Sequence, residues 1–113
     1  MWTSQTYTDS VRALYGGSVV RNGVMYICCG QLNSNNYNNL YFVDFNNESL
    51  AWETATTSGT KPTSRYATQC VLHQNRYMYL WGGRGGSSNN IWFNDMHRFD
   101  FETNTDAGTR LRC

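Results

Sequence analysis

Cysteine and histidine are the residues of this chain whose chemistry could serve a metal site or a nucleophile. The chain contains four cysteines and two histidines: Cys28, Cys29, Cys70, Cys113, His73 and His97. A structural zinc site needs four ligands at suitable spacings, usually including a CxxC pair, and this sequence has no such pair. We therefore expect no metal and no cofactor, and we interpret the first three cysteines as small buried side chains within strands.

The histidines and carboxylates do not form a catalytic pattern. His73 falls in an expected hairpin turn and His97 in an aromatic strand, and neither has a neighbouring serine or cysteine with a nucleophile signature. Asp100 and Glu102 alternate along one strand, which is typical of a solvated rim. The sequence therefore predicts no catalytic residues and a protein that is not an enzyme.

Arg84 lies between two glycine pairs, in Gly82-Gly83-Arg84-Gly85-Gly86, and so belongs to an RGG motif. Such motifs bind RNA when they are repeated in disordered segments, but this one occurs once and the formal net charge is only +1. We interpret the segment as a turn and expect no nucleic-acid partner.

The composition limits the classes of protein to which the chain can belong. The chain has 113 residues, of which 40% are hydrophobic and 15% aromatic, enough for one ordinary domain with a buried core. The first twenty residues do not resemble a secretory signal, and no apolar run reaches the roughly 18 residues that cross a bilayer. We therefore expect no membrane association and a cytoplasmic location.

Short apolar and aromatic runs, bounded by Gly and Asn clusters, predict β-strands along the whole chain. No window shows the apolar stripe of a helix, so the expected fold class is all-β. Arg21-Asn22-Gly23 predicts a tight hairpin, because Asn-Gly adopts positive φ readily, and residues 73–76 form the matching turn. Segments 31–39 and 84–94 are rich in Asn, Ser and Gly, and we expect irregular loops there. The expected strands cover Val24–Cys29, Leu40–Phe45, Tyr77–Trp81 and Met96–Phe101.

These pieces repeat along the chain. Arg12 and Arg65, Tyr26 and Tyr79, and Gly30 and Gly83 are each 53 positions apart, whereas Asp44 and Asp100 are 56 apart and Trp2 and Trp52 are 50 apart. A period near fifty residues, with four short strands per unit, is typical of a propeller-like array.

The second unit resembles a kelch repeat. It has an arginine before its first strand, an aromatic strand ending in Gly82-Gly83, the pair Asn94-Asp95 and then Phe99-Asp100. The first unit has Cys29-Gly30 in place of the double glycine and keeps Val43-Asp44 and the downstream Trp52. The resemblance covers about residues 1–105. It implies a partial kelch β-propeller with two four-stranded antiparallel blades and the outer strand of a preceding blade.

The resemblance also implies a division of the chain. Residues 1–11 would be the outer strand of a preceding blade and a linker, 12–56 the first repeat, and 57–105 a second repeat that lacks its outer strand. Residues 106–113 would be an atypical tail. Because two blades cannot close around an axis, we expect a piece of a larger propeller, with self-association of several copies as the alternative.

Several residues have expected structural roles. Gly30, Gly82 and Gly83 let the backbone bend after the second strand, and Trp52 buries a ring between sheets. Asp44 and Asp100 accept backbone N–H bonds in the following turn. Tyr26 and Tyr79 are matching strand aromatics.

The expected function follows from the resemblance. Kelch domains often bind proteins or peptides with the loops that join the second to the third strand and the fourth strand to the next first strand. The partner-binding candidates at these positions are Arg12, Gln31, Asn33, Arg65, Arg84, Asn90 and Trp92, with Asn36, Ser87 and Asn89 as further loop candidates. For Arg12 and Arg65 the alternative is structural pairing with a carboxylate or carbonyl at the blade junction.

We therefore expect a non-catalytic module that presents inter-strand loops to a protein or peptide partner, as a scaffold or substrate adaptor. The family also occurs in cytoskeletal proteins and in substrate receptors of ubiquitin ligases. Two alternatives remain at this stage. One is a fragment of a kelch-propeller enzyme such as a copper radical oxidase, and the other is a truncated product without an independent function.

Overall fold

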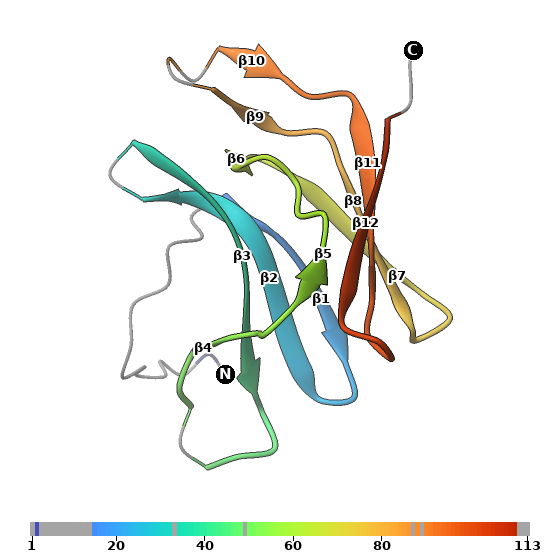
Figure 1. Ribbon diagram of the computed structural model, residues 1–113. Helices are drawn as coiled ribbons and strands as arrows, with labels where there is room; N and C mark the ends of the chain where they lie inside the picture. The colour runs from blue at the N-terminus through green and yellow to red at the C-terminus, as the bar shows by residue number, and fades with distance from the viewer. Residues whose placement is uncertain are drawn as a thin grey trace.

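The computed structural model describes Trp2, residues 15–32, 34–48, 50–86, Ser88 and residues 90–110, with side chains as far as Asp106. The all-β prediction is confirmed, because these residues form strands, turns and bends without a helix (Figure 1). The strands are β1 (Gly17–Arg21), β2 (Val24–Leu32), β3 (Asn35–Asp44), β4 (Glu53–Thr54), β5 (Ser58–Gly59), β6 (Arg65–Tyr66), β7 (Gln69–His73), β8 (Tyr77–Trp81), β9 (Arg84–Gly85), β10 (Ile91–Trp92), β11 (Asp95–Asp100) and β12 (Thr105–Arg110).

The first blade contains β1 to β4 in order, each antiparallel to the strand before it. Its first hairpin turns at Asn22 and Gly23, whose φ angles of 53° and 79° are both positive, as the Asn-Gly sequence predicted. The positive φ favours glycine at position 23, and a Cβ there would also have to displace the end of the exposed Asn46 side chain, 2.6 Å away. The outer strand expected within residues 1–11 lies outside the described residues, apart from the exposed Trp2.

The second blade contains β7, β8, β11 and β12, antiparallel in that order, and β5 adds a short parallel strand beyond β12. The expectation that this blade lacks its outer strand is wrong, because residues 105–110 form β12 and pair with β11 along its full length. Main-chain pairing explains the difference. The free N–H and C=O groups at the edge of β11 accept a neighbouring strand through its backbone, whatever side chains that strand carries.

Both segments expected to be irregular loops are hairpins. β2 continues to Leu32 and β3 begins at Asn35, while β9 and β10 pair within residues 84–94. Asn, Ser and Gly suggested loops, but at the edge of a blade the backbone ladder supplies the hydrogen bonds and polar side chains remain in solvent. The two hairpins end on the same side of the molecule (Figure 1).

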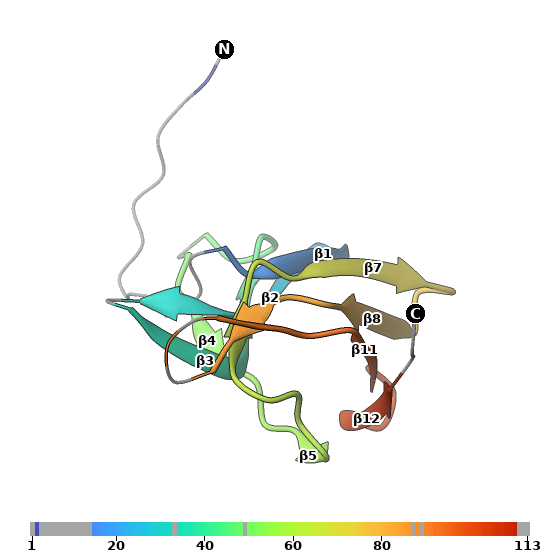
Figure 2. The ribbon, with the colours of Figure 1, turned by 90° about the horizontal axis from the view of Figure 1, so that it is seen from above.

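A band of backbone pairing joins the two units at this end. The sheet order runs β1-β2-β3-β6-β9-β10, with Tyr37 opposite Arg65 and Arg65 opposite Gly85. β6 belongs to the connection that enters the second unit, so the sheet of the first blade continues into the β9–β10 hairpin. Figure 2 shows β1 and β7 along one edge of the molecule, with β4, β5 and β12 on the side away from it.

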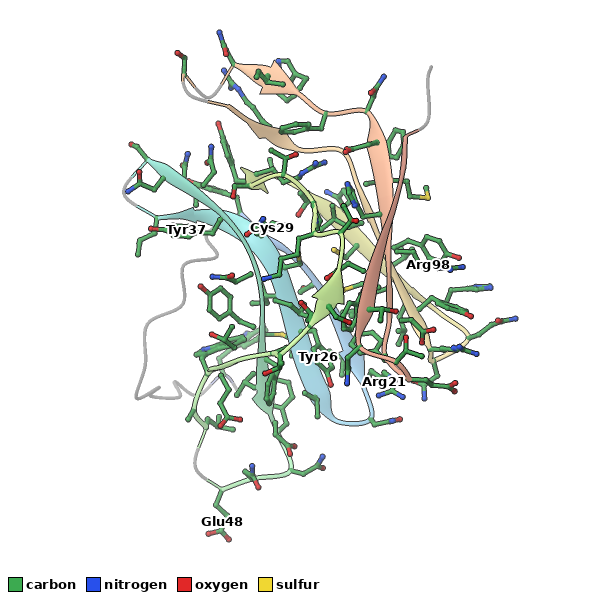
Figure 3. All side chains as sticks on the ribbon, viewed as in Figure 1. Arg21, Tyr26, Cys29, Tyr37, Glu48 and Arg98 are labelled. Atoms are coloured by element: carbon green, nitrogen blue, oxygen red, sulfur yellow. The ribbon has the colours of Figure 1, made fainter. Side chains whose placement is uncertain are left out.

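The main core lies between the two blades. Val19, Cys28 and Leu40 from the first blade pack in one cluster with buried side chains of the second: Met78, Leu80, Phe99 and Phe101. The Tyr26 ring lies 4.5 Å from the Phe101 ring, and the Arg21 guanidinium lies 5.0 Å from the same ring (Figure 3). Cys28 and Cys29 are buried free thiols and Cys70 is half-buried. Burying these apolar faces against each other holds the blades together.

The structural residues occupy turns, bends and strand faces. The carboxylates of Asp44 and Asp100 accept the backbone N–H two residues later, at 2.8 and 2.9 Å. Gly83 has φ 109°, and a Cβ there would lie 2.8 Å from the Thr68 side chain and 2.9 Å from a backbone carbonyl. The pairing of β2 with β3 shifts register between Cys28 and Gly30, so the strand carries a bulge there.

The remaining residues with expected structural roles differ in burial. Gly82 has φ 68°, a left-handed conformation that glycine adopts without strain. Trp52 is half-buried beside β4. Tyr79 is also half-buried, and its ring lies 6.4 Å from that of Tyr77.

Arg65 is a structural residue rather than a partner contact, which corrects its place among the binding candidates. Its side chain is fully buried, and both terminal nitrogens contact the Asp95 carboxylate, Nη2 at 3.0 Å from Oδ2. Nη1 also donates to the Gly82 carbonyl at 3.1 Å and Nε to the Thr63 carbonyl at 2.9 Å. The Phe93 ring lies 3.9 Å from the guanidinium. A planar fork with five donors can satisfy a carboxylate and two carbonyls together, which explains why it lies at the junction.

We predict that Arg65→Met strongly destabilises the chain. The substitution leaves the partly buried Asp95 carboxylate and the carbonyls of Thr63 and Gly82 without their donor. Losing one member of such a pair destabilises by roughly 3 kcal/mol. Urea unfolding measures the change. The control is Arg76→Met, whose ion pair with Asp100 is solvent-exposed and should lower the urea midpoint less. Equal midpoints for the two variants would contradict the structural role of Arg65.

Stability should fall in acid as Asp95 is protonated. Its hydrogen bond to Arg65, with a smaller contribution from His97, lowers the pKa of the Asp95 carboxyl to about 2. A lowered folded-state pKa gives stability that is complete above the unfolded value, about 3.9, and is lost as pH falls toward 2. We expect Asp95→Asn to be less stable than the wild type near neutral pH and to lose less stability between about pH 5 and 2. Unfolding followed by fluorescence at several pH values tests this, and parallel curves for the two proteins would refute it.

Candidate functional site

Two adjoining hollows lie where the β2–β3 hairpin, the β9–β10 hairpin and the connection before β6 come together (Figure 1). The first has a volume of about 320 Å³ and is lined by Ser34, Asn35, Asn36, Thr63, Ser64 and Gly86. The second has a volume of about 270 Å³ and is lined by Thr63, Ile91, Trp92, Phe93, Asn94 and Asp95. Thr63 lines both hollows, and the two together are called the hairpin-end groove below.

Strand pairing places the side chains around this groove. Gln31 lies opposite Asn36, and its Nε2 donates to the Asn36 Oδ1 at 3.3 Å. Arg84 lies opposite Tyr66 on one side and Trp92 on the other. Opposed residues of an antiparallel pair point to the same face, so these three side chains share a face of the sheet.

Trp92 is an exposed aromatic platform beside the groove. Its side chain is 72% exposed, and the Arg84 guanidinium lies 4.9 Å from the centre of its ring. The stacking restricts the ring, so a ligand that covers Trp92 meets a surface that is already oriented. The Arg84 Nε atom is buried and makes no hydrogen bond among the described residues.

Apart from Gly86, Ile91 and Phe93, the rest of the lining is polar and nearly uncharged. Hydroxyl and amide groups of Ser34, Asn35, Thr63 and Ser64 line one side of the groove. The one carboxylate among the lining residues, that of Asp95, has its charge compensated by Arg65. The Asn38 Nδ2 donates to the Pro62 carbonyl at 2.9 Å and ties the connection to β3. Hydroxyls and amides both donate and accept hydrogen bonds, so this lining suits a neutral polar ligand such as a peptide backbone.

The structure separates the predicted binding residues into three groups. Gln31, Asn36, Arg84 and Trp92 lie on the strands that border the groove, and the exposed Asn90 directly precedes β10. Arg65 is buried beneath the junction, as described above. Arg12, Asn33, Ser87 and Asn89 lie outside the described residues.

Sequence reasoning missed the contribution of the connection before β6. Thr63 and Ser64 line the groove, and Phe93 and Asn94 lie on its other side. Two hydroxyl residues directly before Arg65, in the segment that joins the fourth strand of one blade to the next blade, were the available signal. Their proximity to the hairpins depends on the pairing of Tyr37 with Arg65, which residue types do not reveal.

His97, Asp95 and Cys28 are the group that comes nearest to a catalytic arrangement. The His97 Nε2 atom lies 3.0 Å from the Asp95 Oδ2, and its Nδ1 is buried without a hydrogen bond in the described part of the chain. Cys28 and His97 line a common interior cavity, but its volume is only about 10 Å³, which admits about one water molecule. The hydrogen bond between Cys28 and Cys29, together with burial, raises the pKa of the Cys28 thiol. The group therefore lacks the exposed thiolate that a nucleophile needs.

Within the described ranges, no three His, Cys, Asp or Glu side chains are grouped so as to hold a metal ion. Across the same residues, there is no helix with the length and apolar character needed to cross a membrane.

Comparison with known proteins bears on the family. Residues 1–110 match the family model described as the KLHDC2/KLHL20/DRC7 Kelch-repeats domain. Among solved structures, the chain is similar to one titled "Structure of YjhT", a kelch-type propeller, with a TM-score of 0.66 and 21% identity. The similarity covers 87% of this chain and 27% of that chain, so this chain spans about a quarter of its length. The comparison with curated proteins gave no match.

The family match covers nearly the whole chain, and the strand order independently gives two four-stranded blades packed face to face. The chain therefore belongs to the kelch-repeat family, and its structure is a partial kelch β-propeller.

Proposed function

We propose that this chain is a non-catalytic interaction module whose hairpin-end groove binds an extended peptide segment of a protein partner. The observation that carries the proposal is the pair of adjoining hollows that share Thr63 and reach Trp92, whose ring lies 4.9 Å from the Arg84 guanidinium. Kelch-repeat domains of the matched type are typically interaction modules without enzymatic activity, which supports the same reading. A scaffold or substrate-adaptor role, in which recognition alone is required, fits this proposal.

The size and shape of the groove favour a peptide segment over a cofactor. The two hollows measure about 320 and 270 Å³, near the lower end of the roughly 300–1,000 Å³ of small-molecule pockets. They lie side by side and share Thr63, an arrangement that suits consecutive residues of one chain. Trp92 would cover an apolar side chain of the peptide, while the amides and hydroxyls of the groove form hydrogen bonds with the peptide backbone.

The outer edge of β10 offers a second set of hydrogen bonds, from its backbone, to the same peptide. Among the described strands, β10 is the last of its sheet and pairs only with β9. Its outer edge can therefore accept an extended segment by strand addition, in which backbone bonds contribute affinity and alternate side chains contribute specificity. Ile91 and Trp92 lie on this strand and also line the groove.

Loss of the Trp92 ring should weaken peptide binding. We would select binders from a phage-displayed library of random peptides against the 113-residue chain and measure their affinity by titration calorimetry. Trp92→Ala is expected to weaken binding roughly tenfold or more, since buried aromatic anchors contribute over about 1 kcal/mol. Arg84→Ala should weaken peptide binding as well, because the Trp92 ring then loses its contact with the Arg84 guanidinium. Both variants should keep the urea midpoint of the wild type, since neither residue is in the core.

Phe45→Ala provides the matched control. Phe45 is also an exposed aromatic, but it follows β3 at the end of the blade away from the groove (Figure 1). Its loss should leave affinity unchanged. Selected peptides that bind Trp92→Ala and Arg84→Ala as tightly as the wild type would place the binding surface elsewhere and end this proposal.

A further inference from the structure

We propose that Cys28 and Cys29 form a redox-active pair, whose thiols a peroxide converts reversibly into a disulfide between adjacent residues. Their Sγ atoms lie 2.8 Å apart and share a hydrogen bond, and both side chains are buried. The two thiols belong to the core between the blades, and neither lines the hairpin-end groove. The pair is therefore separate from the proposed peptide site.

The backbone at Cys29 brings the two sulfur atoms together. Successive side chains of a regular strand point to opposite faces of the sheet, which keeps the thiols of adjacent cysteines apart. Here the register of β2 against β3 shifts between Cys28 and Gly30, and Cys29 has a φ of 69°. A bulge residue in this left-handed conformation departs from the alternation. Both thiols therefore lie in one core cluster, with Cys29 on the part of β2 that is labelled in Figure 3.

The second blade has glycine at the position of Cys29. Gly82 and Gly83 have φ angles of 68° and 109°, and Cys29 and Gly30, 53 positions earlier, have 69° and 111°. The two units therefore share one backbone conformation at this bend, which glycine adopts without strain and cysteine does not. Strained residues of this kind gather at functional sites. Since glycine would satisfy the backbone better, what Cys29 adds to the bend is a second sulfur atom beside Cys28.

Hydrogen peroxide is the oxidant that suits the surroundings of the pair. Cys28 lines the interior cavity of about 10 Å³, which admits about one water molecule, so only a small oxidant reaches this thiol in the folded chain. The Cys28 thiolate attacks one peroxide oxygen and the O–O bond breaks, which gives a sulfenic acid and hydroxide. The Cys29 thiol then forms the S–S bond and displaces the sulfenic oxygen as water. The two thiols lose two electrons and two protons, and the peroxide is reduced to two water molecules.

The pair should be slow to oxidise and easy to reduce. The hydrogen bond between Cys28 and Cys29, together with burial, raises the pKa of the Cys28 thiol, so little thiolate is present for the first step. The second step is fast, because the two sulfur atoms are already in contact. Adjacent Cα atoms are about 3.8 Å apart, closer than the roughly 4.4–6.8 Å that disulfides usually span. The bond is therefore strained, which makes it readily reducible.

Cys70 provides the internal comparison, because it is the other thiol that lies near the pair. Its Sγ lies beside β1, 2.5 Å from the place that a Cβ of Gly17 would take, and Gly17 pairs with Cys28. Burial, with a smaller contribution from Cys29, raises the pKa of the Cys70 thiol to about 12. The thiol–thiol hydrogen bond joins Cys28 to Cys29, so we expect Cys70 to stay reduced while the pair is oxidised.

Tryptic peptides of the wild-type chain distinguish these cysteines. Peptide 22–65 contains Cys28 and Cys29 alone, because Pro62 protects Lys61 from cleavage, and peptide 66–76 contains Cys70. The folded chain is treated with hydrogen peroxide, unfolded in N-ethylmaleimide to label the remaining thiols, digested and analysed by mass spectrometry. We expect peptide 22–65 without a label and lighter by the mass of two hydrogen atoms, and peptide 66–76 with its label.

Two results of this experiment would overturn the proposal. One is a peptide 22–65 that carries two labels, which would mean that the pair stays reduced. The other is a disulfide between peptides 22–65 and 66–76, which would make Cys70 a partner in the bond. Reduced glutathione, added to the oxidised folded chain before labelling, should restore both labels on peptide 22–65. Persistence of the disulfide in an excess of glutathione would contradict its strain and reversibility.

Two variants test the order of the steps. Cys29→Gly reproduces the backbone of Gly82 and should keep the β-sheet circular dichroism of the wild type. Its Cys28 sulfenic acid has no neighbouring thiol, so dimedone, which traps sulfenic acids, should label Cys28 in this variant after peroxide treatment and far less in the wild type. Equal dimedone labelling of the two proteins would refute the role of Cys29. Cys70→Ser should form the disulfide as the wild type does, and loss of the disulfide in this variant would equally contradict the proposal.

Discussion

The buried guanidinium of Arg65 is the interaction that ties the connection before β6 to the second blade. It gathers the Asp95 carboxylate, the carbonyls of Thr63 and Gly82 and the Phe93 ring around one cation. These groups come from the connection before β6, the bend after β8 and the segment from Phe93 to the start of β11. A buried charge is tolerated only when its hydrogen bonds are complete, so the position of each partner is closely restricted. The hairpin-end groove lies directly over this junction and takes its shape from it.

The packing between the blades has a different origin. Several strands are apolar at consecutive positions, so a blade carries apolar side chains on both faces. The contact between Tyr26 and Phe101 lies between the two blades. On the remaining faces Val71 and Phe45 are exposed, whereas Tyr41 and Val43 are buried. A repeat therefore produces the same kind of interface at each junction between neighbouring blades.

Residue types predicted the local structure well where one residue determines the backbone. Asn22-Gly23 forms the expected hairpin because both residues accept positive φ. Asp44 and Asp100 accept backbone bonds in the turns that follow them, because a short carboxylate reaches the N–H two residues on. Prediction from residue types failed where pairing with a neighbouring strand decides the local structure. Polar residues were interpreted as loops in segments 31–39 and 84–94, and residues 106–113 as a tail, although backbone ladders form strands within the described part of all three regions.

The sequence alone determined the repeat, the all-β class and the kelch pattern, because periodic residues and turn chemistry are local properties. It also named Gln31, Arg84 and Trp92 near the site, since these follow recognisable points of the repeat. Only the tertiary structure decided that Arg65 is enclosed and that Thr63 and Ser64 complete the groove. Both outcomes depend on Tyr37 of β3 pairing with Arg65 of β6 across the two units. Backbone groups make that contact, and because every residue carries the same backbone groups, no residue type signals it.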